Sequence, residues 1–168
     1  KVEKTIGLLQ TTSPSYMMLA LMDHARMMMA TKGEAILSDI LRKSNTIKKA
    51  VKDLGMRCLS EDEVKQQSYE FRLDPAKITI FTNELGMTGY ELERVLDENY
   101  DIQVECGNYD NVIIIVKPGL TSQHVATLIR ALKQIGEQQR KKKIKINFEF
   151  GYFQNEQVME PHEAFFRQ

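Results

Sequence analysis

Residues 112–116, Val-Ile-Ile-Ile-Val, form the stretch that decides the fold, because an unbroken apolar run of β-branched residues favours a strand covered on both faces. The residues just before it, Gly107 to Asn111, are typical of a turn. Ile102 to Glu105 precedes that turn and is predicted to be a second strand. The two strands should therefore form a hairpin with the apolar run in the middle of a sheet.

Helix and strand signals continue on both sides of this hairpin. Downstream, Thr121 or Ser122 is expected to cap a helix, whose apolar stripe would consist of Val125, Leu128, Ile129, Leu132 and Ile135. Upstream, Lys77 to Thr82 is predicted to be a strand, with Ile78 and Ile80 facing inward. Thr88 and Glu91 have the spacing of a capping box, which predicts a helix start there.

The order of these elements indicates the fold class. Residues 145–150 alternate as a half-buried strand does, so the series from Lys77 to Phe150 is strand, helix, strand, strand, helix, strand. This βαββαβ order is that of a split βαβ, ferredoxin-like sandwich. We therefore predict an α+β protein with a ferredoxin-like C-terminal domain at 74–168.

The N-terminal third is predicted to be helical. Thr12-Ser13-Pro14 has the composition of a helix start, and the helix expected from Pro14 to Thr31 contains six of the nine methionines. Because this helix is apolar nearly all round, we expect it to be buried. Lys32-Gly33 should break it, and a second helix should run from Glu34 to Leu54, with Gly55 as its cap. Residues 1–55 would thus be a helical segment, and the polar residues 56–73 a surface connection.

Composition excludes several classes of protein. Lysine plus arginine balance aspartate plus glutamate at 23 each, and no aromatic side chains are available on the central strand, so a nucleic-acid partner is not expected. No apolar run approaches the ~18 residues that span a membrane. Cys58 and Cys106 fit no metal spacing, and so few cysteines suggest a reducing, cytoplasmic location.

Four motifs, in the same order along the chain, carry a family resemblance. They are residues 8–16 (LLQTTSPSY), 74–78 (DPAKI), 85–92 (LGMTGYEL) and 160–166 (EPHEAFF). Together they resemble the family of ornithine/lysine/arginine decarboxylases, which are fold type I enzymes dependent on pyridoxal phosphate. His162 stands where that family more often has arginine, so the charge that the arginine would supply is in question here.

The resemblance implies an activity and a set of partners. It implies a homodimer or higher homo-oligomer, in which residues 1–55 end the cofactor-binding domain and pyridoxal phosphate acts as an electron sink while a basic amino acid loses carbon dioxide. The product would be the corresponding polyamine-type amine. The family's cofactor lysine lies in an S-x-H-K motif, and none of this chain's lysines follows a histidine. That lysine is therefore expected upstream of Lys1, and this chain alone is expected neither to hold the cofactor nor to catalyse the reaction.

The resemblance also assigns candidate site residues. Thr11, Thr12, Ser13 and Ser15 occupy the place from which fold type I enzymes commonly contact the cofactor phosphate, and short hydroxyls at a helix start suit an anion. The alternative for Ser13 is a purely structural N-cap. Tyr16 and Glu163 are candidates for contact with substrate or with a second subunit.

Two other interpretations stay open. The ferredoxin-like unit could be a non-catalytic regulatory or interaction domain, since that fold serves many functions. The chain could also belong to a degenerate homologue that kept the fold and lost the reaction.

Overall fold

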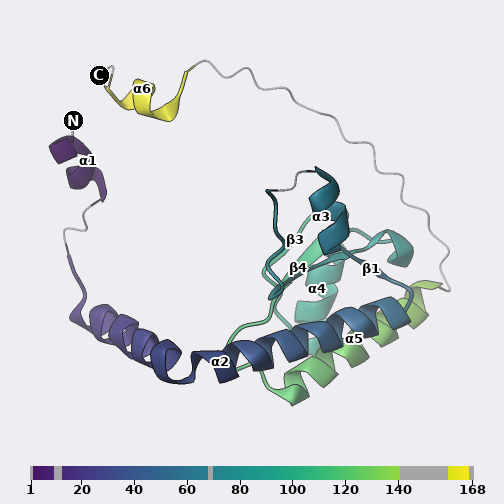
Figure 1. Cartoon of the computed structure of the whole chain (residues 1–168). Coiled ribbons are helices and arrows are strands. Elements are labelled where there is room, and N and C mark those ends of the chain that lie inside the picture. The colour runs from purple at the N-terminus through teal and green to yellow at the C-terminus, as the bar shows by residue number, and fades with distance from the viewer. Residues whose placement is uncertain (1, 10–12, 68–69, 141–158, 167–168) are drawn as a thin grey trace.

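A four-stranded antiparallel sheet organises the computed structural model, which describes residues 2–9, 13–67, 70–140 and 159–166 (Figure 1). Its strands lie in the spatial order β1-β2-β4-β3. Their bounds are Arg57–Cys58 for β1, Lys77–Phe81 for β2, Cys106–Gly107 for β3 and Asn111–Ile115 for β4. β2 and β4 pair along their whole length, from Lys77 opposite Ile115 to Phe81 opposite Asn111, and so form the middle of the sheet.

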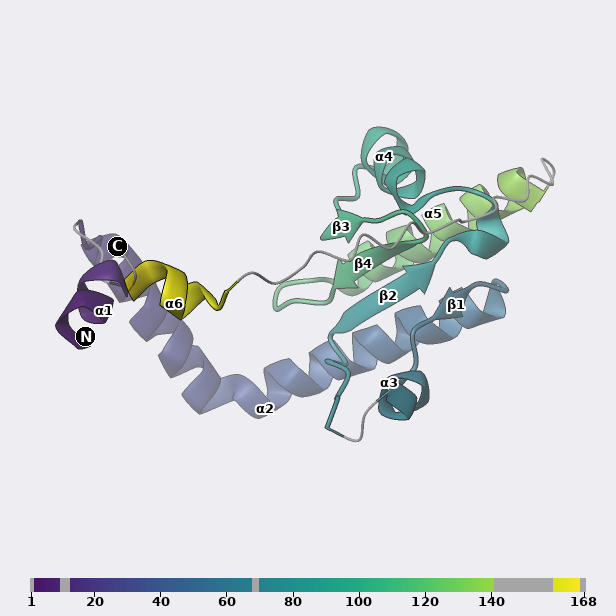
Figure 2. The same ribbon diagram turned by 90° about the horizontal axis from the view of Figure 1, so that it is seen from above.

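Helices cover one face of this sheet. The bounds of the helices are Val2–Leu9 (α1), Tyr16–Asp53 (α2), Glu61–Gln67 (α3), Asn83–Leu85 (η1, a 3-10 turn), Gly89–Tyr100 (α4), Ser122–Arg140 (α5) and Pro161–Phe166 (α6). The C-terminal half of α2 lies beside α5 in both views, and α4 completes the layer (Figures 1 and 2). α1 and α6 lie away from the sheet in both views.

The hydrophobic core lies between the sheet and these three helices. Ile78 and Ile80 of β2 are buried, as the sequence predicts, and α5 buries most of its predicted stripe. The largest fully buried apolar side chains are Ile47, Val51, Ile78, Ile80, Leu92, Leu96, Val112, Val116, Leu132 and Ile135. β4 alternates between buried and half-buried residues instead of being covered on both faces, because the helices lie on one side only.

The α+β class is confirmed, while the complete ferredoxin-like arrangement is not. The order β2-β4-β3 is what a split βαβ unit requires, with β4 between the two strands that flank α4. The expected strand at 145–150 lies outside the described residues, and β1 occupies the position beside β2. The predicted hairpin is present, but its first strand is Cys106–Gly107 rather than Ile102 to Glu105.

Two predictions for the N-terminal half are wrong. Lys32-Gly33 does not end a helix, since α2 is continuous from Tyr16 to Asp53 and only bends along its length (Figure 2). A glycine inside a helix costs only about 1 kcal/mol, which a long and partly packed helix tolerates. The polar stretch 56–73 is also not a plain connection, because it contains β1 and α3. Ser60 and Glu63 cap α3 with the S-x-x-E spacing that could have revealed it.

Local capping signals are confirmed. Thr88 and Glu91 form a complete capping box at the start of α4. Gly55 follows α2 with a φ of +76°, a left-handed conformation that favours glycine. Thr121 caps α5, where its hydroxyl accepts from the His124 amide at 3.2 Å.

Candidate functional site

The start of α2 holds the segment to which sequence analysis assigns the cofactor phosphate. Ser15, not Ser13, is the N-cap: its hydroxyl accepts from the Met18 amide at 3.3 Å, and helix α2 starts at Tyr16, two residues after the predicted position. Proline at position 14 precedes the cap instead of opening the helix. No acidic residue lies in the first turn, so the partial positive charge of the helix end is not neutralised there. Thr11 and Thr12 lie outside the described residues.

The methionine-rich half of α2 is exposed, contrary to the prediction that it is buried. Tyr16 is 85% exposed, and the apolar residues beyond it are also open to solvent. The exposed apolar residues of this helix half are Met17, Met18, Leu19, Leu21, Met22, Met27 and Met29. The prediction fails because no other element in the described part of the chain packs against this half. This half of α2 therefore exposes large apolar side chains that the rest of the described structure does not cover.

Glu163 lies on the short helix α6 and is exposed. Among the described residues, no hydrogen bond or ion pair joins its side chain to Ser15 or Tyr16. His162 lies on the same helix.

The motif at residues 74–78 anchors α2 to the sheet. The Pro75 carbonyl accepts from the buried Ser44 hydroxyl at 2.5 Å and from Lys48 Nζ at 3.1 Å. The Asp74 carboxylate accepts from the Ala76 amide at 2.9 Å and closes the turn that leads into β2. This motif therefore fixes the C-terminal half of α2 in place.

The motif at residues 85–92 joins α4 to the β3–β4 hairpin. The Gly89 and Tyr90 amides donate to the carbonyls of Tyr109 and Asn108 at 3.3 and 3.1 Å. A Cβ atom at Gly89 would lie 1.9 Å from the Asn111 carbonyl oxygen, so only glycine fits this approach. Because the hairpin uses the free amides of this helix end, the motif is structural and offers no anion site.

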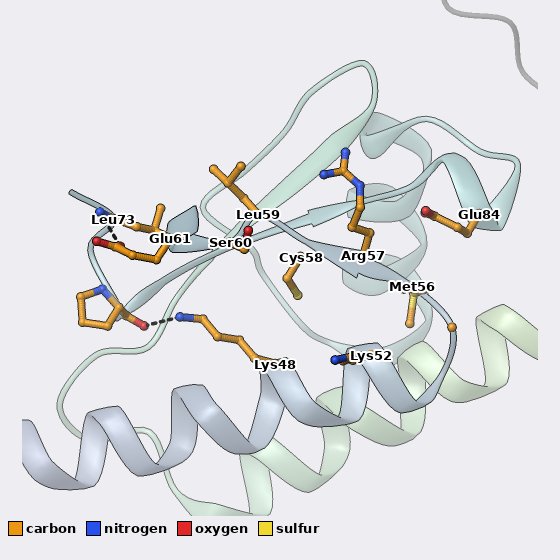
Figure 3. Close-up of a pocket in the computed structure, with 12 residues that line it drawn as sticks. Lys48, Lys52, Met56, Arg57, Cys58, Leu59, Ser60, Glu61, Leu73 and Glu84 are labelled. Carbon is orange, nitrogen blue, oxygen red and sulfur yellow. Dashed lines mark hydrogen bonds between the residues drawn. The ribbon is translucent and has the colours of Figure 1, made fainter. Parts of the chain in front are cut away.

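A cavity of about 640 Å³ lies between α2 and β1 (Figure 3). Lys48 and Lys52 line it from α2. Cys58 of β1 and Met56, the residue just before β1, line the opposite wall, and Leu73 lies at one end. Burial raises the pKa of the Cys58 thiol to about 11, despite the nearby Lys48. This cavity could not be predicted from the sequence because its lining comes from segments that are separate along the chain.

Two further properties concern the described residues. They contain no group of three or more histidine, cysteine, aspartate or glutamate side chains that could hold a metal ion. Among these residues, no helix has both the length and the apolar character needed to cross a membrane.

Comparison with known proteins connects the motifs to a family. The model of the family "Orn/Lys/Arg decarboxylase, major domain" matches residues 1–124. The chain is 34% identical over 134 residues to an arginine decarboxylase of Bacillus anthracis, covering 80% of this chain and 27% of that protein. It is 31% identical over 139 residues to an arginine decarboxylase of Bacillus subtilis (strain 168), covering 82% of this chain and 28% of that protein.

A third arginine decarboxylase, from Halalkalibacterium halodurans, is 31% identical over 138 residues, with 82% of this chain and 28% of that protein covered. The chain therefore spans less than a third of the length of the curated relatives it matches. Since the family model extends over residues 1–124, well over half of the 168 residues, this chain belongs to the Orn/Lys/Arg decarboxylase family.

Proposed function

We propose that this chain is part of a pyridoxal-phosphate-dependent decarboxylase that converts arginine to the corresponding amine and carbon dioxide. The match of the family model over residues 1–124 carries the proposal, because it includes both the start of α2 and its anchor on the sheet. Arginine is preferred over lysine and ornithine because the relatives described above are named arginine decarboxylases.

The start of α2 suits the phosphate group of the cofactor. Ser15 uses its hydroxyl oxygen to accept from Met18, so its proton is still available to donate. Ser13 is exposed beside it, and the first turn carries no opposing acid. Thr11, Thr12, Ser13 and Ser15 would hold the phosphate, and the bound cofactor would supply an electron sink for the carbanion left by carbon dioxide.

The exposed half of α2 supports a homo-oligomer. Tyr16 and the methionines that follow it form an exposed apolar surface. We expect this surface to be buried against another protein surface in the active enzyme. A second copy of the protein, in a dimer or a multiple of dimers, would cover this surface. Tyr16 and Glu163 would then contact the substrate or the partner subunit.

The cofactor lysine would come from a part of the enzyme outside this chain. No lysine here follows a histidine, as the family motif requires. These 168 residues alone would therefore neither hold pyridoxal phosphate nor release carbon dioxide.

The test starts with the complete protein that contains this chain. Its mass should exceed the 19.4 kDa of these residues, it should absorb visible light when loaded with cofactor, and it should release carbon dioxide from arginine faster than from lysine or ornithine. A complete protein that is colourless and inactive on all three would favour the degenerate-homologue or regulatory-domain interpretation.

Substitutions at Ser15 separate a phosphate contact from a helix cap. Ser15→Ala should weaken cofactor binding about tenfold, the effect of one charge-assisted hydrogen bond. Ser15→Asp keeps the cap but places a negative charge beside the phosphate, so it should weaken binding further while the helix stays capped. Ser38→Ala, an exposed serine on the same helix, is the matched control. Unchanged cofactor affinity in Ser15→Asp would refute the phosphate assignment.

A further inference from the structure

The cavity between α2 and β1 has a cationic wall. Lys48 and Lys52 are one helical turn apart, so their side chains leave α2 from the same face, with Cβ atoms roughly 6 Å apart. In Figure 3 the Lys48 side chain crosses the cavity toward the Pro75 carbonyl. The side chains of Met56 and Cys58 point from the opposite wall toward α2.

The positive charge of this wall is not neutralised by its neighbours. Neither Lys48 nor Lys52 forms an ion pair within the described residues. The Glu61 carboxylate, at one end of the cavity, already accepts from the Leu73 amide at 3.0 Å and lies 3.6 Å from Lys65 Nζ. Glu84 is exposed at the other end. Both lysines therefore line the cavity without an ion-pair partner among the described residues, and the Lys48 ammonium donates to the Pro75 carbonyl at 3.1 Å.

Arg57 contributes backbone rather than charge to the lining. Its side chain points away from α2 (Figure 3). The guanidinium lies 3.6 Å from the centre of the Phe81 ring and 2.5 Å from the Glu63 carboxylate. The cationic wall thus consists of Lys48 and Lys52 alone.

Most of the remaining lining is apolar. Its apolar side chains are Met56, Cys58, Leu59, Leu73 and Pro75, and its polar residues besides the lysines and Arg57 are Ser60, Glu61 and Glu84. The Cys58 thiol stays neutral at physiological pH because burial raises its pKa to about 11, so it adds no negative charge. A volume of about 640 Å³ is in the range of sites for small organic ligands.

We propose that this cavity binds an amphipathic organic carboxylate, with its head between the Lys48 and Lys52 ammonium groups and its apolar body along Met56, Cys58 and Leu73. The charge and the lining complement the two parts of such a ligand. Roughly 50 Å of helix separates Lys48 from Ser15, so this site is distinct from the proposed cofactor contact and does not depend on it.

Sodium octanoate serves as the probe, and the labelling rate of Cys58 in the complete protein serves as the readout. Mass spectrometry of the peptides that contain Cys58 and Cys106 follows their alkylation while octanoate is titrated. Octanoate should protect Cys58 in a saturable manner and leave Cys106, the other cysteine of this chain, unaffected. From butanoate to octanoate the affinity should rise about fourfold per methylene. Octanol, which has the same body without the charge, should protect far less.

Lysine substitutions test the cationic wall. Lys52→Gln should weaken octanoate binding about fivefold, and the double variant Lys48→Gln with Lys52→Gln should weaken it further. The Lys52 side chain forms no hydrogen bond or ion pair within the described residues, and the substitution leaves its backbone carbonyl free to accept from the Gly55 amide as before. Lys49→Gln, an exposed neighbour outside the cavity lining, is the matched control and should leave the affinity unchanged. The proposal is overturned if octanoate does not protect Cys58, if octanol protects it equally, or if Lys52→Gln binds octanoate as Lys49→Gln does.

Discussion

Replacing Gly89 by alanine should destabilise the protein, although alanine is normally the better helix former. The added Cβ atom would lie 1.9 Å from the Asn111 carbonyl oxygen and 2.4 Å from that of Asn108. Both neighbours are backbone atoms, so they cannot rotate away, and the start of α4 must move by about 1 Å or more. That movement weakens the Gly89 and Tyr90 hydrogen bonds to the hairpin.

The expected loss of stability is the sum of three contributions: weakened hydrogen bonds, overpacking and helix propensity. Two weakened hydrogen bonds cost about 1 kcal/mol each, and overpacking adds about 1–3 kcal/mol. The intrinsic preference for alanine offsets about 1 kcal/mol, so the free energy of unfolding should fall by about 3 kcal/mol. For a protein of this size the midpoint of thermal unfolding should drop by roughly 6–12 °C.

Urea unfolding followed by circular dichroism measures this change. The matched control is Gly136→Ala on α5, where the new Cβ would meet only Leu85 Cδ2 at an ordinary 3.7 Å. That substitution should be neutral or stabilising by up to about 1 kcal/mol. If Gly89→Ala unfolds at the same urea concentration as Gly136→Ala, the close contact between α4 and the hairpin is refuted.

Three further predictions concern other positions. Ser44→Ala should lower the free energy of unfolding by about 1 kcal/mol, because it removes the buried 2.5 Å bond to the Pro75 carbonyl; an unchanged urea midpoint would contradict that anchor. Hydrogen bonds from Ser60 lower the pKa of Glu63, so its ionised form stabilises the fold above the ordinary pKa of glutamate; Glu63→Gln should destabilise at neutral pH, and the difference should vanish in acid unfolding as the pH falls through the folded-state pKa. Burial raises the pKa of the Cys58 thiol to about 11, so the neutral thiol contributes fully to the free energy of unfolding below the unfolded-state pKa, and this contribution is lost as the pH rises through about 11. Cys58→Val should therefore reduce the loss of stability in alkaline solution. Equal slopes of the free energy of unfolding against pH in the two proteins would contradict this prediction.

Elements with complete local signals were predictable from the sequence. The capping box of Thr88 and Glu91 satisfies two helix amides within four residues, so its geometry is local. The stripe on α5 repeats at helical spacing, and Ile78 and Ile80 alternate as a strand does. In each case the residues that decide the structure are neighbours in the sequence.

Features that depend on distant residues were not predictable. Gly33 looks like a helix break, but it is buried inside a helix that is held at Ser44 and Lys48 by the carbonyl of Pro75. The first strand of the hairpin is set by pairing of Cys106 with Ile113, which shifts it beyond residues 102–105, where apolar and polar side chains alternate. The cavity lining likewise meets only after α2, β1 and the Leu73 segment have come together.

The position of the proposed cofactor segment also depends on contacts far along the chain. Ser15 begins α2, and α2 continues without interruption to the residues that are fixed on the sheet. The motif at 74–78 holds this helix through Ser44 and Lys48, so one of the motifs that carry the family resemblance orients the helix. Because a continuous helix transmits the direction of its anchored half, the direction of the proposed phosphate-binding segment at Ser15 depends on the packing of a core that contains none of its proposed ligands.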